Sequence, residues 1–254
     1  MAGPGETLRV AAISDVHGNS AALDAVLADI ARTGADLTVN LGDCLSGPLD
    51  AAGTAGRLLA LGVPTVAGNH DRALVDRPPE AMGAWERPVI GCLTPHLRDW
   101  LTSLPATRMV EGLFLCHGTP ASDSEMWLDR PGPDGVLALA PQPDIDGAAA
   151  GVAGEVLLSG HTHVPRVVRL SDGRLAVNPG SVGCPAWADR RGAAPVRAET
   201  GAPDARYALL ERRGGRWQAA LRAVPYDAEG MVALARAAGE ADWDSALTTG
   251  RVPA

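Results

Sequence analysis

Lysine is absent from this sequence, so all 22 of its basic side chains are arginines. Acidic residues are more numerous, and the formal net charge of −8 argues against a broad nucleic-acid-binding surface. This charge does not exclude a small phosphate substrate, because bound divalent cations can be the largest local charges in a site.

Long apolar runs and paired cysteines are missing as well. No segment reaches the ~18 consecutive apolar residues of a membrane-spanning helix, and Met1–Glu6 lacks the basic region and apolar core of a signal peptide. The four cysteines contain no C-x-x-C pair, which predicts unpaired thiols in a reducing compartment. We therefore expect a cytoplasmic protein without a membrane partner.

Histidine is scarce but concentrated. Five of the six histidines fall in short glycine-containing motifs that follow apolar runs. The motifs of this kind are Ser14-Asp15-Val16-His17-Gly18-Asn19, Leu41-Gly42-Asp43, Gly68-Asn69-His70-Asp71, Cys116-His117-Gly118 and Gly160-His161-Thr162-His163. The sixth histidine, His96, is expected on the wetter side of an amphipathic helix over Leu93–Leu104.

The first ~80 residues alternate between strand and helix patterns. Strands are expected at Leu8–Ile13, Asp36–Leu41 and Val63–Ala67, and helices at Ser20–Ala31 and Asp50–Leu61. This rhythm predicts a parallel sheet with right-handed crossovers, in which ligands bind outside the carboxyl ends of the strands. The first three motifs fall at those ends.

The remainder of the chain favours hairpins. Strands are expected at Met109–Cys116, Glu155–Ser159, Arg166–Leu170, Arg174–Val177, Arg206–Leu210 and Arg216–Val224, with a short helix over Asp144–Val152. Segments 119–143 and 184–203 are predicted as lid-like loops, and 228–239 as a last helix before a loosely held tail. Because no repeat or linker separates two cores, we predict a single α/β domain over 1–254, with two sheets packed face to face and helices outside.

Seven side chains in the motifs are candidate metal ligands: Asp15, His17, Asp43, Asn69, His117, His161 and His163. Seven ligands are too many for one tetrahedral ion and suit two ions ~3.5–4 Å apart that share a bridging carboxylate. Nitrogen and oxygen donors without thiolate favour Mn, Fe, Co, Ni or Zn over Ca or Mg. The predicted cofactors are therefore two divalent or transition metal ions.

The five motifs, in this order, resemble those of the metallophosphoesterase superfamily, also called calcineurin-like phosphoesterases, and most closely its small bacterial single-domain members. The resemblance implies a four-layer α/β/β/α sandwich of two mixed β-sheets flanked by helices. It also implies a role for each motif residue. Asp15, His17 and His163 are implied to hold the first metal, Asn69, His117 and His161 the second, and Asp43 both.

The same resemblance makes His70 the non-ligand histidine beside the scissile phosphate, with Asp71 orienting it. Two divalent ions lower the pKa of a shared water, so that a bridging hydroxide can attack phosphorus near neutral pH. The leaving alkoxide then needs a proton, which a histidinium can supply. Arg72 is a weaker candidate for gripping the phosphate, with a surface arginine as the alternative.

These features predict a binuclear metal-dependent phosphodiesterase acting on a small or nucleotide-like diester, with His70 as general acid. Two alternatives stay open. One is a phosphomonoesterase, protein phosphatase or dinucleoside polyphosphate hydrolase, although protein phosphatases of the superfamily carry an arginine-containing G-D-x-V-D-R-G motif where this chain has Gly42–Pro48. The other is a non-catalytic scaffold. Small relatives often form dimers or higher assemblies, so a homo-oligomer is a state to test.

Overall fold

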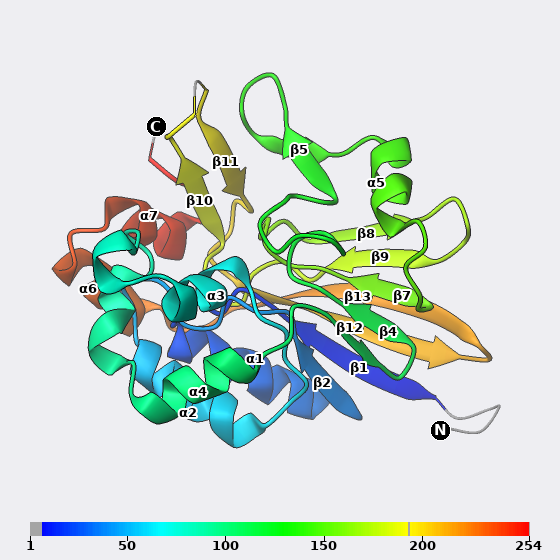
Figure 1. Cartoon of the computed structure of the whole chain (residues 1–254), viewed down its shortest axis with the longest axis horizontal. Coiled ribbons are helices and arrows are strands. Elements are labelled where there is room, and N and C mark those ends of the chain that lie inside the picture. Colours follow the sequence, from blue (N-terminus) through cyan, green and yellow to red (C-terminus); the bar gives the residue numbers. More distant parts are fainter. Residues whose placement is uncertain (1–6, 193, 254) are drawn as a thin grey trace.

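The computed structural model describes residues 7–192 and 194–253, so the prediction for Met1–Glu6 lies outside it. Two mixed sheets form its centre (Figure 1). The first has the order β13-β12-β1-β2, built from β1 (Leu8–Ile13), β2 (Leu37–Asn40), β12 (Ala205–Arg213) and β13 (Arg216–Val224). The second has the order β3-β4-β7-β9-β8, built from β3 (Arg108–Val110), β4 (Leu113–Leu115), β7 (Val156–Leu158), β8 (Arg166–Arg169) and β9 (Leu175–Asn178).

The apolar cores show how the two sheets are stacked. Alternate residues of a strand face opposite sides, so Val10 and Ala12 of β1 enter a core shared with β4, β7 and β9 between the sheets. Ala11 and Ile13 enter a second core with α1 (Ser20–Thr33), α2 (Ala51–Leu61) and α4 (Pro95–Ser103). A third core joins the outer face of the second sheet to α5 (Gln142–Ala149). Figure 1 shows these helices on opposite sides of the paired sheets.

The first β-α unit is explained by its sequence. All but the first two residues of β1 are buried, which accounts for its continuous apolar run. The Asn19 side chain caps α1 by accepting a hydrogen bond from the Ala22 N–H at 3.0 Å. Gly34, with a φ of 69°, ends the helix in the left-handed conformation. The predictions for this strand and helix are confirmed.

Two predicted strands are wrong in extent. Only one bridge, between Asn40 and Thr65, remains of the expected strand Val63–Ala67, because Pro64 has no N–H to offer a ladder. The expected strand Met109–Cys116 divides into β3 and β4, because Glu111 and Gly112 turn the chain with φ values of 48° and 83°.

The predicted lid-like loops contain hairpins instead. Segment 119–143 holds β5 (Asp129–Pro131) and β6 (Leu137–Leu139), and segment 184–203 holds β10 (Ala186–Asp189) and β11 (Val196–Glu199). Strands of three or four residues offer too few alternations for a pattern to indicate them. A bridge between Val136 and Arg197 connects the two hairpins.

The chain end is packed rather than loose. The predicted helix 228–239 is confirmed as α6 (Glu229–Ala237), and a second helix, α7 (Ala241–Thr249), follows it. Trp243 of α7 is 4% exposed and packs in a core with α6. Gly250 ends α7 with a φ of 67°. None of the described helices combines the length and apolar character that crossing a membrane requires.

Candidate metal centre

The chemistry-bearing motifs meet where the carboxyl ends of strands from both sheets come together. Asp15 and His17 follow β1, Asp43 follows β2, His117 follows β4, and His161 and His163 follow β7. Asn69 starts α3 (Asn69–Asp76). Parallel pairing of β1 with β2 and of β4 with β7 brings these ends to a common edge.

Six of the seven candidate ligands form two groups. Asp15, His17 and His163 make the first, and Asp43, His117 and His161 the second, each with ligand atoms within 4.8 Å of one another. In the first group, His163 Nε2 lies 3.2 Å from Asp15 Oδ1 and 3.2 Å from His17 Nε2. Below, the first group means Asp15, His17 and His163, and the second group means Asp43, His117 and His161.

Asp43, a member of the second group, also lies near the first. Its Oδ2 atom is 3.1 Å from Nε2 of His117 and 3.9 Å from Nε2 of His17. Its Oδ1 atom accepts a hydrogen bond from the His70 N–H at 2.9 Å. The Asp43 carboxylate therefore lies within 4 Å of a histidine from each group.

Three unpartnered atoms indicate that the site is built for cations. Asp15 Oδ1, Asn69 Oδ1 and His117 Nε2 are buried and make no hydrogen bond, although the Asp15 and His117 atoms lie at ion-pair distance from His163 and Asp43. Leaving such atoms unsatisfied costs about 1–3 kcal/mol each, and native structures leave few of them. All three belong to candidate ligands, and a metal ion would satisfy them. The residues of the two groups therefore have the chemistry of metal-ion ligands.

The outer ring nitrogens orient the imidazoles. Nδ1 of His117 donates to the Leu41 carbonyl and Nδ1 of His163 to the Cys184 carbonyl, both at 2.7 Å. Nδ1 of His17 lies 2.8 Å from Ser46 Oγ. A carbonyl accepts only, so Nδ1 of His117 and of His163 keeps its proton, and Nε2 is the nitrogen that can bind a metal once its own proton has left.

Backbone strain is concentrated in the same residues. Among the described residues, positive φ outside glycine occurs at Glu111 and at five candidate ligands. Those five are Asp15 (54°), His17 (48°), Asp43 (55°), His161 (68°) and His163 (62°). Such conformations cost of order 1–3 kcal/mol each and cluster at functional sites.

Burial and neighbouring charges shift the pKa values of these groups apart. Burial lowers the pKa of His17 to about 3, and burial together with the charge of His117 lowers that of His161 to about 4. For His117, burial is outweighed by Asp43, and the pKa rises to about 10. Burial also opposes ionisation of Asp15, but His163 and His117 outweigh it and lower the pKa to about 2. The carboxylate is thus held in the charged form that metal ligation needs.

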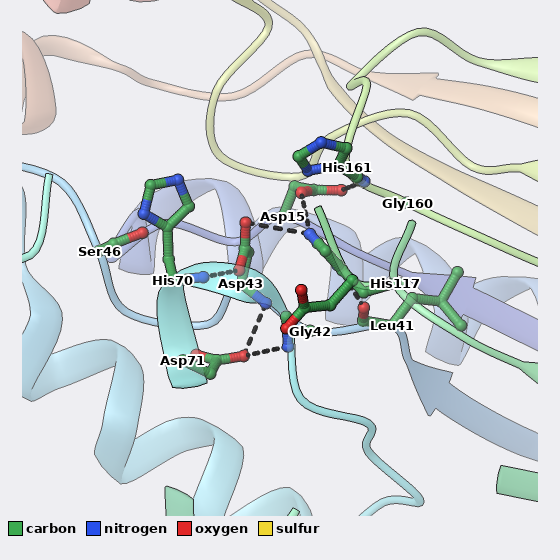
Figure 2. A network of polar contacts seen from close by, with 12 residues as sticks. Asp15, Leu41, Gly42, Asp43, Ser46, His70, Asp71, His117, Gly160 and His161 are labelled. Atoms are coloured by element: carbon green, nitrogen blue, oxygen red, sulfur yellow. Dashed lines mark hydrogen bonds and ion pairs between the residues drawn. The ribbon is translucent and has the colours of Figure 1, made fainter. Parts of the chain in front are cut away.

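Asp71 does not contact the His70 ring, and the predicted pairing of these two residues is wrong. The Asp71 carboxylate accepts hydrogen bonds from the N–H groups of Asp43 (2.7 Å), Cys44 (3.0 Å) and Gly68 (3.0 Å). Figure 2 shows it pointing away from the His70 ring. Asp71 instead fixes the backbone that carries Asp43. Burial and the nearby Asp43 charge raise its pKa to about 6.

The His70 ring has two other partners, which the sequence did not indicate. Its Nδ1 atom contacts Oε1 of Glu86, and its plane stacks on Trp85 with centroids 5.1 Å apart and an interplanar angle of 14°. Both residues lie between two short 3-10 helices, Pro79–Ala81 and Arg87–Cys92. Their position depends on turns that no periodicity reveals.

Arg72 is engaged by another side chain. Its guanidinium donates to both carboxylate oxygens of Asp123, at 2.5 and 2.9 Å, and its side chain is 46% exposed. The pair links α3 to the segment that follows His117. His96 is exposed on α4, as predicted, and all four cysteines are free thiols.

Three tryptophans, which we call the aromatic wall, surround the first group: Trp85, Trp187 and Trp243. Trp85 and Trp243 lie 4.9 and 6.1 Å from the His17 ring, and Trp187 lies 6.2 Å from the His163 ring. His17 and His163 are only 0% and 3% exposed. The second group is more open, because His161 and the neighbouring Asn69 are half-buried.

Comparison with known proteins agrees with this fold. The crystal structure of a metallophosphoesterase from Sphaerobacter thermophilus is 26% identical, with a TM-score of 0.70 over 91% of this chain and 95% of that one. Hypothetical protein PH1004 from Pyrococcus horikoshii OT3 is 18% identical, with a TM-score of 0.70 over 96% and 98% of the two chains, which shows the fold alone. A putative diadenosine tetraphosphatase is also 18% identical, with a TM-score of 0.51 over 86% and 94%.

Among curated proteins, none matches the chain. The family model described as the calcineurin-like phosphoesterase superfamily domain matches residues 8–201, a span that contains all five motifs. This match covers most of the chain and confirms the resemblance that the motifs predicted. The chain belongs to the calcineurin-like phosphoesterase superfamily.

Proposed function

We propose that this chain is a binuclear metal-dependent phosphodiesterase acting on a small or nucleotide-like diester. The observation that carries the proposal is the pair of Asp/His groups with Asp43 between them. In this proposal, Asp15, His17 and His163 hold one ion, Asn69, His117 and His161 hold the other, and Asp43 contacts both. The unpartnered oxygen of Asn69 supports its inclusion in the second set.

In this proposal, the side chains of the chain hold the ions in place, and His70 supplies the proton for the leaving group. Ions held in the two groups would supply Lewis acidity that activates water and offsets phosphoryl charge. Because Glu86 occupies Nδ1 of His70, Nε2 is the nitrogen left to donate a proton to the leaving oxygen. The hydrogen bond from the His70 N–H to Asp43 keeps this donor beside the shared carboxylate.

The engagement of Arg72 favours a diester over a monoester. A phosphomonoester carries close to two negative charges near neutral pH, whereas a diester carries one. Arg72 lies next to the site in sequence, but Asp123 already occupies its guanidinium. An arginine that is paired in this way has less capacity to bind the additional negative charge of a monoester, which suits the less charged diester.

The test is hydrolysis of matched aryl phosphomonoester and phosphodiester substrates by metal-stripped protein, with Mn, Fe, Co, Ni or Zn restored singly. We expect diester turnover that needs added metal and falls ~10²–10⁴-fold in His70→Ala, the range for a lost general acid, at unchanged metal content. His96→Ala, an exposed histidine on α4, is the matched control. A preference for the monoester would favour the monoesterase alternative, and a protein that neither binds metal nor hydrolyses either ester would favour a scaffold.

A further inference from the structure

Trp85 and Glu86 contact His70 from two directions, although neither belongs to a motif. We propose that these two residues form a clamp that positions His70 as the proton donor to the leaving group. The inference rests on the proposed function and assigns two positioning residues to it. It places on Glu86 the task that the resemblance gave to Asp71.

The Glu86 carboxylate is fixed by its own loop. The residue is 4% exposed, and while Oε1 contacts His70 Nδ1, Oε2 accepts a hydrogen bond from the Gly83 N–H at 2.8 Å. A Cβ atom added at Gly83 would lie 2.8 Å from the same Oε2. Glycine at position 83 therefore leaves the space in which the carboxylate is held.

Trp85 restricts the ring in the other direction. Its indole stacks on the His70 plane, and it contacts Trp243 with ring centroids 4.9 Å apart. Its carbonyl accepts a hydrogen bond from the Gly47 N–H at 2.7 Å. The stacked plane limits rotation of the imidazole while Glu86 selects Nδ1, so Nε2 has one direction in which to point.

Asp71 is not available for this task. Its two carboxylate oxygens are occupied by backbone N–H groups of Asp43, Cys44 and Gly68. A carboxylate partner for His70 must therefore come from elsewhere, and Glu86 is the side chain that contacts the ring nitrogen.

The dependence of rate on the leaving group tests the clamp. A positioned acid matters most when the leaving oxygen is strongly basic and least when it leaves unaided. We would measure kcat for a series of aryl phosphodiesters with leaving phenols of increasing pKa, using wild type, Glu86→Gln and Glu86→Ala. We expect Glu86→Ala to lose ~10–100-fold on the most basic leaving group, little on the least basic, and Glu86→Gln to fall between them.

Two further variants serve as controls, one that should have no effect and one that should act on Glu86 indirectly. Glu80→Gln, an exposed glutamate in the same segment, should leave the series unchanged. Gly83→Ala should reproduce the leaving-group dependence of the Glu86 variants without altering the carboxylate itself. Metal content and thermal unfolding of each variant show whether the centre and the fold are intact.

A uniform loss over the whole series in the Glu86 variants, at unchanged metal content, would overturn the clamp, because a merely structural residue would act alike on every leaving group. The proposed function fails differently. In that case the wild type itself would hydrolyse none of the diesters with any of the metals supplied. The clamp would then have no proton donor to position.

Discussion

The two halves of the candidate centre use the same ligand chemistry in different surroundings. The first group is closed by the aromatic wall, with its two histidines at 0% and 3% exposure, whereas His161 of the second group is half-buried. The carboxylate and histidine ligands of both halves follow strands. The wall comes from the loop after α3, from β10 and from α7. Strand ends thus determine what can bind, and segments distant in sequence determine what can reach it.

The wall also extends beyond the region that defines the family. The family model ends at residue 201, and Trp243 lies on α7, after that point. The closure of the first half therefore depends in part on a segment that the family match does not include.

Replacing Asp43 should affect metal binding in both halves of the centre at once. Asp43→Asn removes a charge that both halves use, so we expect bound metal to fall from two ions to one or none. Hydrolysis should decrease by more than the ~10–100-fold typical of an outer-shell change. Metal analysis and kcat measure this, with Asp99→Asn, an exposed residue of α4, as the control. Retention of both ions would argue against a bridging role.

Removing Trp243 should open the closed half. Truncating a buried tryptophan costs about 3–5 kcal/mol, so Trp243→Ala should lower the free energy of unfolding by that amount in chemical denaturation of the metal-free protein. Trp243→Phe should recover part of it. An alanine variant as stable as wild type would show that the wall is loosely packed in solution.

Chelation should distinguish the halves in the intact protein. With two Mn ions bound, we expect a chelator to remove them in two phases, the faster from the open second group. The slow phase should approach the fast one in Trp243→Ala. The time course of metal release measures this without reference to catalysis. A single phase in wild type would mean that the difference in exposure does not govern release.

The smallest expected effect concerns Asp29, which lies away from the metal centre. Its replacement should change the stability of the fold at low pH without changing metal binding. Asp29 is buried, and hydrogen bonds from Arg222 and Tyr207 lower its pKa to about 2. A depressed carboxyl pKa stabilises the fold above about pH 4, and this contribution is lost as the pH falls toward 2. Asp29→Asn should be less stable by about 2 kcal/mol at pH 7.

The difference between wild type and Asp29→Asn should shrink between pH 4 and pH 2, as measured by denaturation of metal-free protein at each pH. Metal binding at neutral pH should be equal in the two proteins. A stability difference that stays constant with pH would mean that the ion pair with Arg222 is not the cause.

The sequence could predict that six of the candidate ligands lie near one another, because each comes shortly after a strand and strand ends are readable from apolar runs. It misplaced Asp71, although a signal was present. Asp71 is the third residue of α3 after Gly68, the position from which a carboxylate caps the helix start, and its hydrogen bond to the Gly68 N–H does this. Asp71 is predicted to orient His70, but its carboxylate caps the start of α3 instead.

Other features had weaker signals. The spacing of Trp243 and Leu247, with Gly250 after them, is typical of a short helix and its end, and would have predicted α7. Glu86 had no comparable signal, because its contact with His70 depends on two short 3-10 helices and the turn at Gly83. Three-residue strands such as β5 and β6 are set by their neighbours rather than by their own pattern.

The pairing of β1 with β12 has a consequence for biosynthesis. Leu8 is opposite Arg212 in this ladder, so one edge of the apolar strand β1 has no partner until residues 205–213 have been synthesised. Non-local pairing of this kind is slow, and an unpaired apolar edge is prone to aggregation. Asp15 and His17 follow directly from this strand. A nascent chain that has already incorporated all seven candidate ligands therefore still lacks β12 and β13, and the strand that leads to Asp15 and His17 still has one unpaired edge.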